Sequence, residues 1–255
     1  MNTVIVVFML AMGLAIGSFL NVCIYRLPRR ESLMYPGSHC PVCNRSLAWF
    51  ENLPLSSWLV LRGRCRTCRT PIPVQYPLVE AITAAVFVGA YFIYGWTPFL
   101  AARLLFACAM IVLFVIDLQH RILPNAITLP GIVIGFILSF FLPPGWRSSL
   151  VGLLAGGGVL FAIGESYYRL RGYEGLGMGD VKMLAMIGAF LGWPLMLVTL
   201  VLASFAGSAV GVGLLVSRRG DMKAALPFGT FLAVGALVAA VAGDAFLAWY
   251  LTLYK

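Results

Sequence analysis

Long apolar runs, separated by short segments rich in polar residues, glycine or proline, form the main pattern along this chain. A helix needs roughly 20 mostly apolar residues to cross a hydrocarbon core about 30 Å thick, so such runs predict membrane-spanning helices. We expect about eight spans, and the boundary at Trp193-Pro194 is the hardest to place because the run before it is short. The runs cover residues 4–24, 76–94, 98–116, 126–142, 149–166, 181–192, 195–216 and 225–253.

The first run is expected to be a retained helix rather than a secretory signal. No basic residue precedes it, and it is longer than the apolar region of a signal peptide. Arg26, Arg29 and Arg30 follow it directly. Since basic residues concentrate on the cytoplasmic side of membrane proteins, this arrangement predicts an N-terminus outside the cell.

The remaining cations agree with eight spans in that orientation. Fifteen of the 18 Lys and Arg residues fall in segments predicted to be cytoplasmic, and only Arg103, Arg147 and Lys255 fall on the other side. The cytoplasmic group comprises Arg26, Arg29, Arg30, Arg45, Arg62, Arg64, Arg66, Arg69, Arg121, Arg169, Arg171, Lys182, Arg218, Arg219 and Lys223.

Composition supports a membrane protein over other classes. The chain is 61% hydrophobic and 11% charged, whereas soluble domains average about 45–50% and about 25%. This disfavours a soluble domain, a disordered or collagen-like chain and, despite the net charge of +9, a nucleic-acid-binding domain. The predicted fold is an all-α polytopic helical bundle with a first transmembrane helix (1–25), a cytoplasmic insert (26–75) and a transmembrane catalytic bundle (76–255).

The cytoplasmic insert contains a pattern typical of a zinc site. Two CxxC pairs, Cys40 with Cys43 and Cys65 with Cys68, are separated by 21 residues, which suits a tetrahedral four-thiolate site. An insert of this size has little core, so bound metal would supply folding energy. Redox thiols and a catalytic metal are the alternatives, although four cysteine ligands leave no open position. His39 adjoins Cys40 and is expected to be a solvated loop residue.

Two aspartates lie where ionisable groups are costly and therefore point to function. Asp117 ends the third predicted span, and Asp180 begins the sixth, both on the cytoplasmic side. Such a pair suits a two-carboxylate hydrolase, in which one ionised Asp activates water and one protonated Asp donates to the scissile carbonyl. Gly177 and Gly179 precede Asp180 in a GxGD sequence, where backbone could approach a substrate strand closely.

Each of these residues also has a structural interpretation. Asp180 could cap its helix, and Asp117 could pair with Arg121. Glu80 could make an inward polar contact or bind substrate, and Lys182 could act on a nearby carboxyl group or mark the membrane interface. Two further patterns predict structure: Glu165 is expected to pair with Arg169 at i,i+4 spacing, and Gly152 and Gly156–158 are expected to allow close helix packing.

Taken together, the motifs resemble those of bacterial prepilin peptidases, the membrane aspartic proteases that process type IV prepilins and type II secretion pseudopilins. The match extends nearly from end to end, and the order and spacing of the motifs make it specific. It rests on GSFLNVCIYR (17–26), the two CxxC pairs, WFENLP (49–54), YPLVE (76–80), Asp117 with Pro124-Asn125, GMGDVK (177–182) and PFG (227–229).

The resemblance implies that Asp117 and Asp180 are the catalytic pair and that the four insert cysteines form the family's zinc-type site. It implies a multi-pass protein of the cell inner membrane that cuts prepilins after a glycine at the cytoplasmic face. It also implies methylation of the new N-terminus with S-adenosylmethionine, for which no residue forms a recognisable fingerprint. Gly177, Gly179, Lys182 and Glu80 become candidate substrate contacts. Thr230 stands where many relatives have proline, a departure that we expect to be harmless.

Other functions compete with this interpretation. A presenilin-like GxGD protease would place its first aspartate differently and lack the four-cysteine insert. A proton-coupled transporter would use Asp117 and Asp180 as a relay, but the chain shows no internal repeat. A zinc-stabilised assembly factor would need neither carboxylate.

Overall fold

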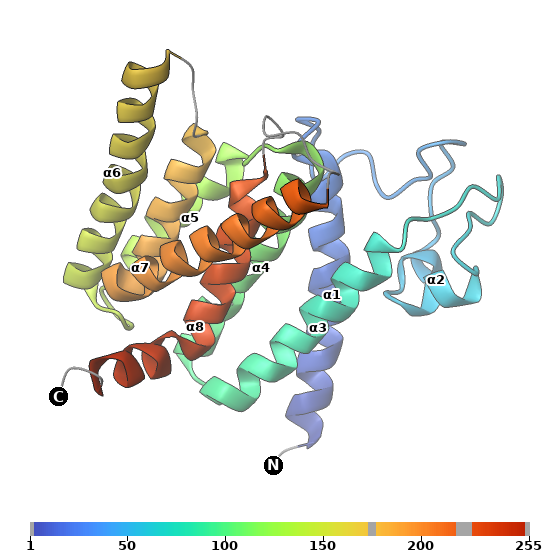
Figure 1. The fold of residues 1–255 in the computed structure, drawn as a ribbon. Helices are drawn as coiled ribbons and strands as arrows, with labels where there is room; N and C mark the ends of the chain where they lie inside the picture. Colours follow the sequence, from blue (N-terminus) through green and yellow to red (C-terminus); the bar gives the residue numbers. More distant parts are fainter. Residues whose placement is uncertain (1–2, 173–176, 218–225, 253–255) are drawn as a thin grey trace. The chain divides into compact units, whose positions relative to one another are not determined.

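The computed structural model describes residues 3–172, 177–217 and 226–252, and these are mostly helical (Figure 1). No strand occurs within those ranges, in agreement with the predicted all-α fold. Two isolated bridges, His39 with Ser46 and Arg64 with Pro71, are the extended pairings found there. The helices are α1 (Thr3–Arg26), η1 (Trp49–Asn52), α2 (Ser56–Val60), α3 (Gln75–Tyr94), α4 (Pro98–His120), α5 (Asn125–Leu138), α6 (Trp146–Arg171), α7 (Met178–Val216) and α8 (Phe228–Thr252).

Each predicted apolar run lies mainly within a helix, but the number of long helices is smaller than predicted. Among the described residues, six helices are long and apolar enough to cross a membrane: α1, α3, α4, α6, α7 and α8. The difference arises because α5 has only 14 residues and because the runs 181–192 and 195–216 both fall within α7. Arg218, Arg219, Lys223 and Lys255, which entered the charge argument, lie outside the described residues.

Contacts divide the chain into two compact units, Met1–Val112 and Leu113–Lys255, and the division falls inside α4. In the first unit, α1 and α3 pack side by side (Figure 1). The halves of α1 and α3 that lie away from the insert share an apolar cluster with the start of α4, formed by Met9, Phe87, Leu100 and Leu104. The insert connects α1 to α3, so both of its ends are fixed by this helix pair.

The close packing of α1 and α3 depends on Gly13 and Gly17, which are spaced as GxxxG. A Cβ atom added to Gly13 would lie 2.6 Å from the Cα atom of Ala84, and one added to Gly17 would lie 2.7 Å from that of Glu80. Small residues at this spacing let two spans approach through their backbones. As a result, Glu80 is held against the last turns of α1.

In the second unit, α7 is the central helix and contacts α5, α6 and α8. Its helical geometry is interrupted at Gly192, where φ is 77° and ψ is 171°. This left-handed φ favours glycine, and Pro194 lacks the N–H that would continue the hydrogen-bond ladder. The boundary predicted at Trp193-Pro194 therefore corresponds to a break between two helical segments.

The predicted glycine packing is confirmed for α6 and α7. A Cβ atom on Gly152 would lie 2.5 Å from the carbonyl oxygen of Gly188, and one on Gly156 would lie 2.8 Å from that of Leu184. Gly158, by contrast, faces open space. The predicted pair of Glu165 with Arg169 is also confirmed, with an Nε–Oε1 distance of 2.8 Å.

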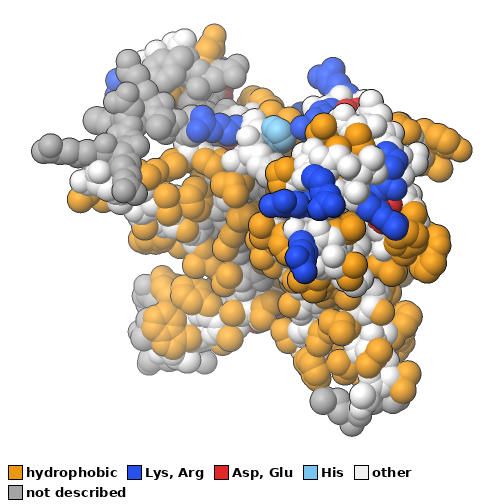
Figure 2. Space-filling view, turned by 90° about the vertical axis from the view of Figure 1, so that its right-hand side faces the viewer, with side chains coloured by type: hydrophobic (Ala, Val, Ile, Leu, Met, Phe, Trp, Pro, Cys, Tyr) orange, Lys and Arg blue, Asp and Glu red, His pale blue; other side chains and the backbone are white. Residues whose placement is uncertain are grey.

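The surface of the insert differs from that of the spans. Figure 2 shows Lys and Arg side chains gathered over the insert, and hydrophobic side chains covering the helices below it. Exposed arginines of the insert include Arg62, Arg64, Arg66 and Arg69. Large apolar residues such as Val4, Phe8 and Phe92 are exposed along α1 and α3, as expected where lipid replaces water.

Candidate functional site

Asp117 lies in the last turn of α4, is only 4% exposed, and is held by the start of α8. Its Oδ2 atom accepts hydrogen bonds from the Thr230 backbone nitrogen at 2.6 Å and from the Thr230 hydroxyl at 3.0 Å. Thr230 is the third residue of α8, and the first N–H groups of a helix have no partner within the helix. The start of α8 thus supplies two hydrogen-bond donors to this carboxylate, and the positive N-terminal end of the helix dipole favours its negative charge.

Asp180 is the third residue of α7 and is partly exposed. Its backbone nitrogen donates to the Gly177 carbonyl oxygen at 3.0 Å, and a Cβ atom on Gly177 would lie 3.4 Å from the Asp180 Oδ2 atom. The carboxylate therefore lies beside the start of its own helix, the position that a cap requires. Capping and chemistry are compatible here, because a carboxylate has two oxygens and several acceptor positions.

Asp117 and Asp180 are each next to a glycine: a Cβ atom on Gly229 would lie 3.0 Å from the Asp117 Oδ2 atom, and Gly179 directly precedes Asp180. One side chain, Leu123, packs beside both of their neighbouring glycines. A Cβ atom on Gly179 would lie 3.0 Å from the Leu123 Cβ atom, and one on Gly229 would lie 2.9 Å from the Leu123 Cδ1 atom. Residues 63 positions apart in the sequence are thereby brought to one end of the second unit.

Lys182 and Arg121 do not pair with these carboxylates. The Lys182 ammonium group donates to the Asn125 side-chain oxygen at 3.0 Å, which joins the start of α7 to the start of α5. Arg121 contacts Asp117 through the backbone, with its nitrogen 2.9 Å from the Asp117 carbonyl oxygen. The ion pairs found in the described part of the chain are Arg45 with Glu51 and Arg169 with Glu165. The alternative pairing of Asp117 with Arg121 is therefore not observed.

Glu80, the remaining candidate substrate contact, belongs to the first unit. It is 7% exposed, and its Oε2 atom accepts a hydrogen bond of 2.8 Å from the Leu55 backbone nitrogen. This bond connects α3 to the insert. Glu80 also lines a pocket of the first unit, together with Asn21 and Glu51. The sequence argument did not single out Asn21 or Glu51, although both fall within motifs that it quoted.

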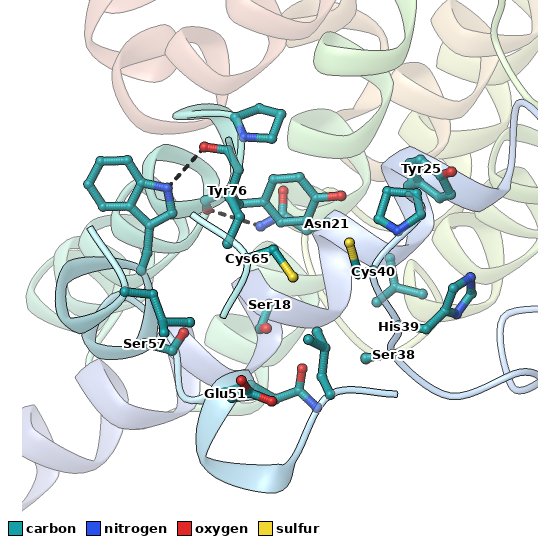
Figure 3. A pocket seen from close by; sticks show the side chains of 18 of the residues that line it. Ser18, Asn21, Tyr25, Ser38, His39, Cys40, Glu51, Ser57, Cys65 and Tyr76 are labelled. Carbon is teal, nitrogen blue, oxygen red and sulfur yellow. Dashed lines mark hydrogen bonds between the residues drawn. The ribbon is translucent and has the colours of Figure 1, made fainter. Parts of the chain in front are cut away.

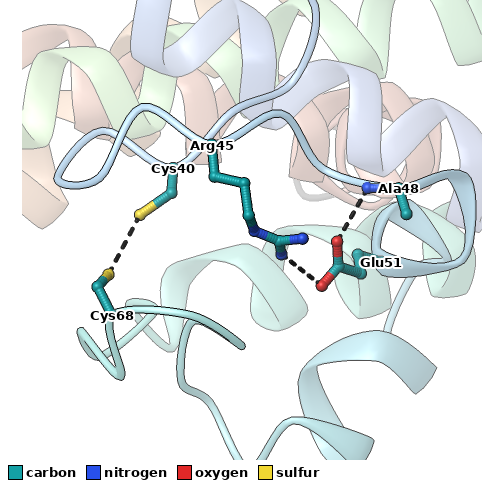
Figure 4. Close-up of polar contacts among 5 residues, drawn as sticks. All are labelled: Cys40, Arg45, Ala48, Glu51 and Cys68. Carbon is teal, nitrogen blue, oxygen red and sulfur yellow. Dashed lines mark hydrogen bonds and ion pairs between the residues drawn. The ribbon is translucent and has the colours of Figure 1, made fainter.

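The four insert cysteines converge as their spacing predicts. Their sulfur atoms all lie within 4.8 Å of one another, and the Cys40 and Cys68 sulfurs are 3.7 Å apart (Figure 4). A tetrahedral zinc ion with Zn–S bonds of about 2.3 Å holds its sulfurs about 3.8 Å apart. The cluster therefore fits zinc, and none of the four cysteines is in a disulfide. His39 is not part of the cluster, and its Nδ1 atom lies 2.9 Å from the Gly37 carbonyl oxygen.

The local backbone explains why the cysteines converge. Each CxxC pair lies in a short loop, or knuckle (residues 40–45 and 65–70). In both knuckles the backbone nitrogen of the first cysteine donates to a carbonyl oxygen at the end of the loop: Cys40 to Arg45 at 2.9 Å, and Cys65 to Thr70 at 2.8 Å. The Thr70 hydroxyl lies 3.2 Å from the Cys68 sulfur and lowers the pKa of Cys68 to about 6. Since the thiolate is the form that binds metal, this hydrogen bond favours ligation.

An ion pair stabilises the loop that contains Cys40 and Cys43. Arg45 contacts the Glu51 Oε1 atom at 2.6 Å, and the Ala48 nitrogen donates to the Oε2 atom at 2.9 Å (Figure 4). The Arg45 hydrogen bond holds the pKa of Glu51 below its ordinary value. Glu51 thus remains ionised and fixes the loop between the first knuckle and η1.

Two families match separate parts of the chain. Residues 11–94 match the bacterial peptidase A24 N-terminal domain, and residues 104–212 match the type IV leader peptidase family. These ranges fall on the helix pair with the insert and on most of the aspartate-bearing region, respectively.

Curated relatives match nearly the whole chain. A prepilin leader peptidase/N-methyltransferase of Aeromonas hydrophila is 39% identical, over 94% of this chain and 91% of the relative. Relatives of the same name from Pseudomonas putida and Burkholderia pseudomallei (strain 1026b) are 36% and 37% identical. They cover 91% and 89% of this chain and 89% and 82% of their own lengths. No solved structure matches this chain significantly.

Proposed function

This chain belongs to the type IV leader peptidase family, and from that premise we propose that it is a bifunctional membrane enzyme. Its first activity is aspartic endopeptidase cleavage of the leader from type IV prepilins and type II pseudopilins, after a glycine at the cytoplasmic face. Its second activity is methylation of the new N-terminus. The enzyme is a multi-pass protein of the cell inner membrane, with its N-terminus outside.

The observation that carries the peptidase assignment is the pairing of Asp117 with Asp180 at one end of the second unit. The two Thr230 donors favour the ionised form of Asp117, because hydrogen bonds to a carboxylate stabilise its charge. Asp180, at the partly exposed start of α7, is the other member of the pair. In our proposal Asp117 is therefore the base, and Asp180 carries the shared proton.

Cleavage then proceeds in two steps. Both Thr230 donors bind Oδ2 of Asp117, so its Oδ1 atom takes the proton from a water molecule as that water attacks the scissile carbonyl carbon. Asp180 donates its proton to the carbonyl oxygen, which gives a neutral tetrahedral diol. The diol collapses as one hydroxyl proton returns to Asp180 and the proton on Asp117 passes to the leaving amine. The peptide bond breaks, and the starting protonation states are restored.

The insert has a supporting role in this proposal. Cys40, Cys43, Cys65 and Cys68 hold a structural zinc ion, which supplies the folding energy that a segment of this size lacks. The ion takes no part in peptide cleavage, because four thiolates leave it no position for water. S-adenosylmethionine supplies the methyl group for the second activity.

Substitution of each aspartate by asparagine tests the peptidase assignment. Purified Asp117→Asn and Asp180→Asn enzymes, incubated with a full-length prepilin in detergent, should each cleave about 10²–10⁴-fold more slowly than wild type, the usual contribution of a general acid or base. Asp244→Asn is the matched control, since it changes an exposed carboxylate of α8. Mass spectrometry of the pilin reads the cut. Wild-type cleavage by either active-site variant would contradict the assignment.

A further inference from the structure

The first unit contains a pocket that peptide cleavage does not use. Its volume is about 230 Å³, and α1, α3 and the insert form its walls (Figure 3). Polar and aromatic side chains from all three elements line it: Asn21 and Tyr25 of α1, Tyr76 and Glu80 of α3, and Glu51 and Trp58 of the insert. All of them belong to a unit that contains neither Asp117 nor Asp180.

One wall of this pocket carries an acceptor that no protein group satisfies. Asn21 is 3% exposed, and its amide nitrogen donates to the Tyr76 carbonyl oxygen at 3.0 Å (Figure 3). Because a carbonyl oxygen only accepts, this bond fixes which way the amide points. The Asn21 Oδ1 atom is left buried without a hydrogen-bond partner. Buried polar atoms are normally paired, so this oxygen indicates a ligand that donates.

A carboxylate in the same pocket lacks a cation. Glu80 is buried and accepts a hydrogen bond from the Leu55 nitrogen. Neither ion pair found in the described residues involves it, although Arg26 and Arg66 also line the pocket. Arg26 donates instead to backbone carbonyl oxygens, including that of Pro36. Charged groups are rarely buried unless they are paired. A positively charged group with N–H donors would complete its contacts.

Aromatic rings complete this environment. Tyr25, Tyr76 and Trp58 line the pocket, although the Arg29 guanidinium already lies over the Tyr25 ring. The Trp58 indole is fixed by a hydrogen bond of 3.2 Å from its Nε1 atom to the Ile72 carbonyl oxygen. Faces of aromatic rings attract cations and pack against planar or apolar groups. Together with Asn21 and Glu80, they select an ammonium group attached to an aromatic or apolar body.

We propose that this pocket is the methyl-transfer site and that Asn21 and Glu80 bind the ammonium group of one of its substrates. The inference rests on the proposed methyltransferase activity, whose two substrates both have this chemistry: the new N-terminus of the pilin and the amino-acid end of S-adenosylmethionine. In the transfer, the pilin amine first loses a proton to water. Its nitrogen then bonds to the methyl carbon as the carbon–sulfur bond breaks, and the bonding electrons return to sulfur to give S-adenosylhomocysteine.

Glu80→Gln tests the proposal, because glutamine keeps an acceptor for the Leu55 amide but removes the charge. Cleavage of a prepilin and methylation of the product are measured on the same sample by mass spectrometry. Methylation should fall roughly 30-fold or more, as expected when one partner of a buried charged pair is removed, while cleavage falls much less and zinc content stays at the wild-type value. Glu165→Gln, which alters a carboxylate of an exposed ion pair, should change neither activity.

Two further measurements identify the substrate that is bound. If binding of tritiated S-adenosylmethionine is lost in Glu80→Gln, the pocket holds the methyl donor. If that binding persists and the KM for leader-free pilin rises, the pocket holds the pilin amine. The proposal is overturned if Glu80→Gln methylates at the wild-type rate, loses cleavage as steeply as methylation, or loses zinc. Absence of methylation by the wild-type enzyme would instead contradict the proposed function.

Discussion

The two units of this protein satisfy their buried polar groups in different ways. In the second unit, the carboxylate of Asp117 is bound by the backbone and hydroxyl donors of Thr230. In the first unit, the Asn21 oxygen has no protein partner, Glu80 has no cation, and four cysteine sulfurs converge without a disulfide. In the second unit, the protein itself positions the reactive carboxylate. In the first unit, the polar groups are arranged to bind partners that the chain does not supply, namely a metal ion and a substrate.

The largest effect is expected from removing the metal ion from the first unit. Small zinc domains gain on the order of 10 kcal/mol of folding free energy from the ion. Cys40→Ser and Cys65→Ser should therefore lose zinc, expose the insert to trypsin and abolish methylation, because both cysteines also line the pocket. Cleavage should fall much less. Elemental analysis, limited proteolysis and the paired mass-spectrometric assay give the three readouts.

Cys108→Ser provides the control for that experiment. Cys108 belongs to α4 and lies outside the cluster, so the variant should retain zinc and both activities. Wild-type protein that contains no zinc, or insert variants that lose cleavage and methylation to the same degree, would contradict the division of roles between the two units.

A smaller effect is expected from changing the α1–α3 contact. Gly17→Leu places a side chain against the backbone of Glu80, and overpacking of this kind costs about 1–3 kcal/mol or somewhat more. We expect a lower thermal unfolding temperature in detergent and a weaker methylation activity, because Glu80 moves relative to Asn21. Gly89→Ala is the matched variant on α3: its Cβ atom meets nothing within 4 Å, so it should leave the protein as stable as wild type or more so. Equal stability of the two variants would argue against this helix contact.

An effect of similar size, on cleavage alone, is expected at Thr230 in the second unit. Thr230→Val removes the hydroxyl donor to Asp117 but keeps the backbone donor, so one hydrogen bond to a charged group is lost, worth about 1.5–3 kcal/mol. Steady-state cleavage should slow by roughly 10–100-fold, with methylation of leader-free pilin unchanged. Thr230→Ser retains the hydroxyl and should stay close to wild type. If valine and serine behave alike, the hydroxyl does not position Asp117.

The sequence predicted features that depend on neighbouring residues or on simple spacing. Apolar run lengths located the helices, the proline at position 194 located the break in α7, and two CxxC pairs predicted the converging cysteines. The GxxxG pattern of α1 is also visible in the sequence, but close helix packing was predicted only for the glycines of α6.

Other features could not be predicted in this way because they depend on which helix ends meet. Thr230 looked like a harmless departure, and its role becomes visible only when the start of α8 lies against the end of α4, 113 residues away. The unsatisfied oxygen of Asn21 likewise depends on the Tyr76 carbonyl oxygen of another helix. The length of α5 could not be predicted either, because an apolar run does not reveal how many of its residues will be helical.

The most direct test of the account is a crossed assay of Asp180→Asn on two substrates. With prepilin, this variant should leave the leader attached. With pilin already freed of its leader, and with S-adenosylmethionine, it should add the methyl group at the wild-type rate, as read by the mass of the product. Release of the leader by Asp180→Asn, or loss of methylation on the leader-free substrate, would contradict the claim that the two activities depend on separate sets of residues.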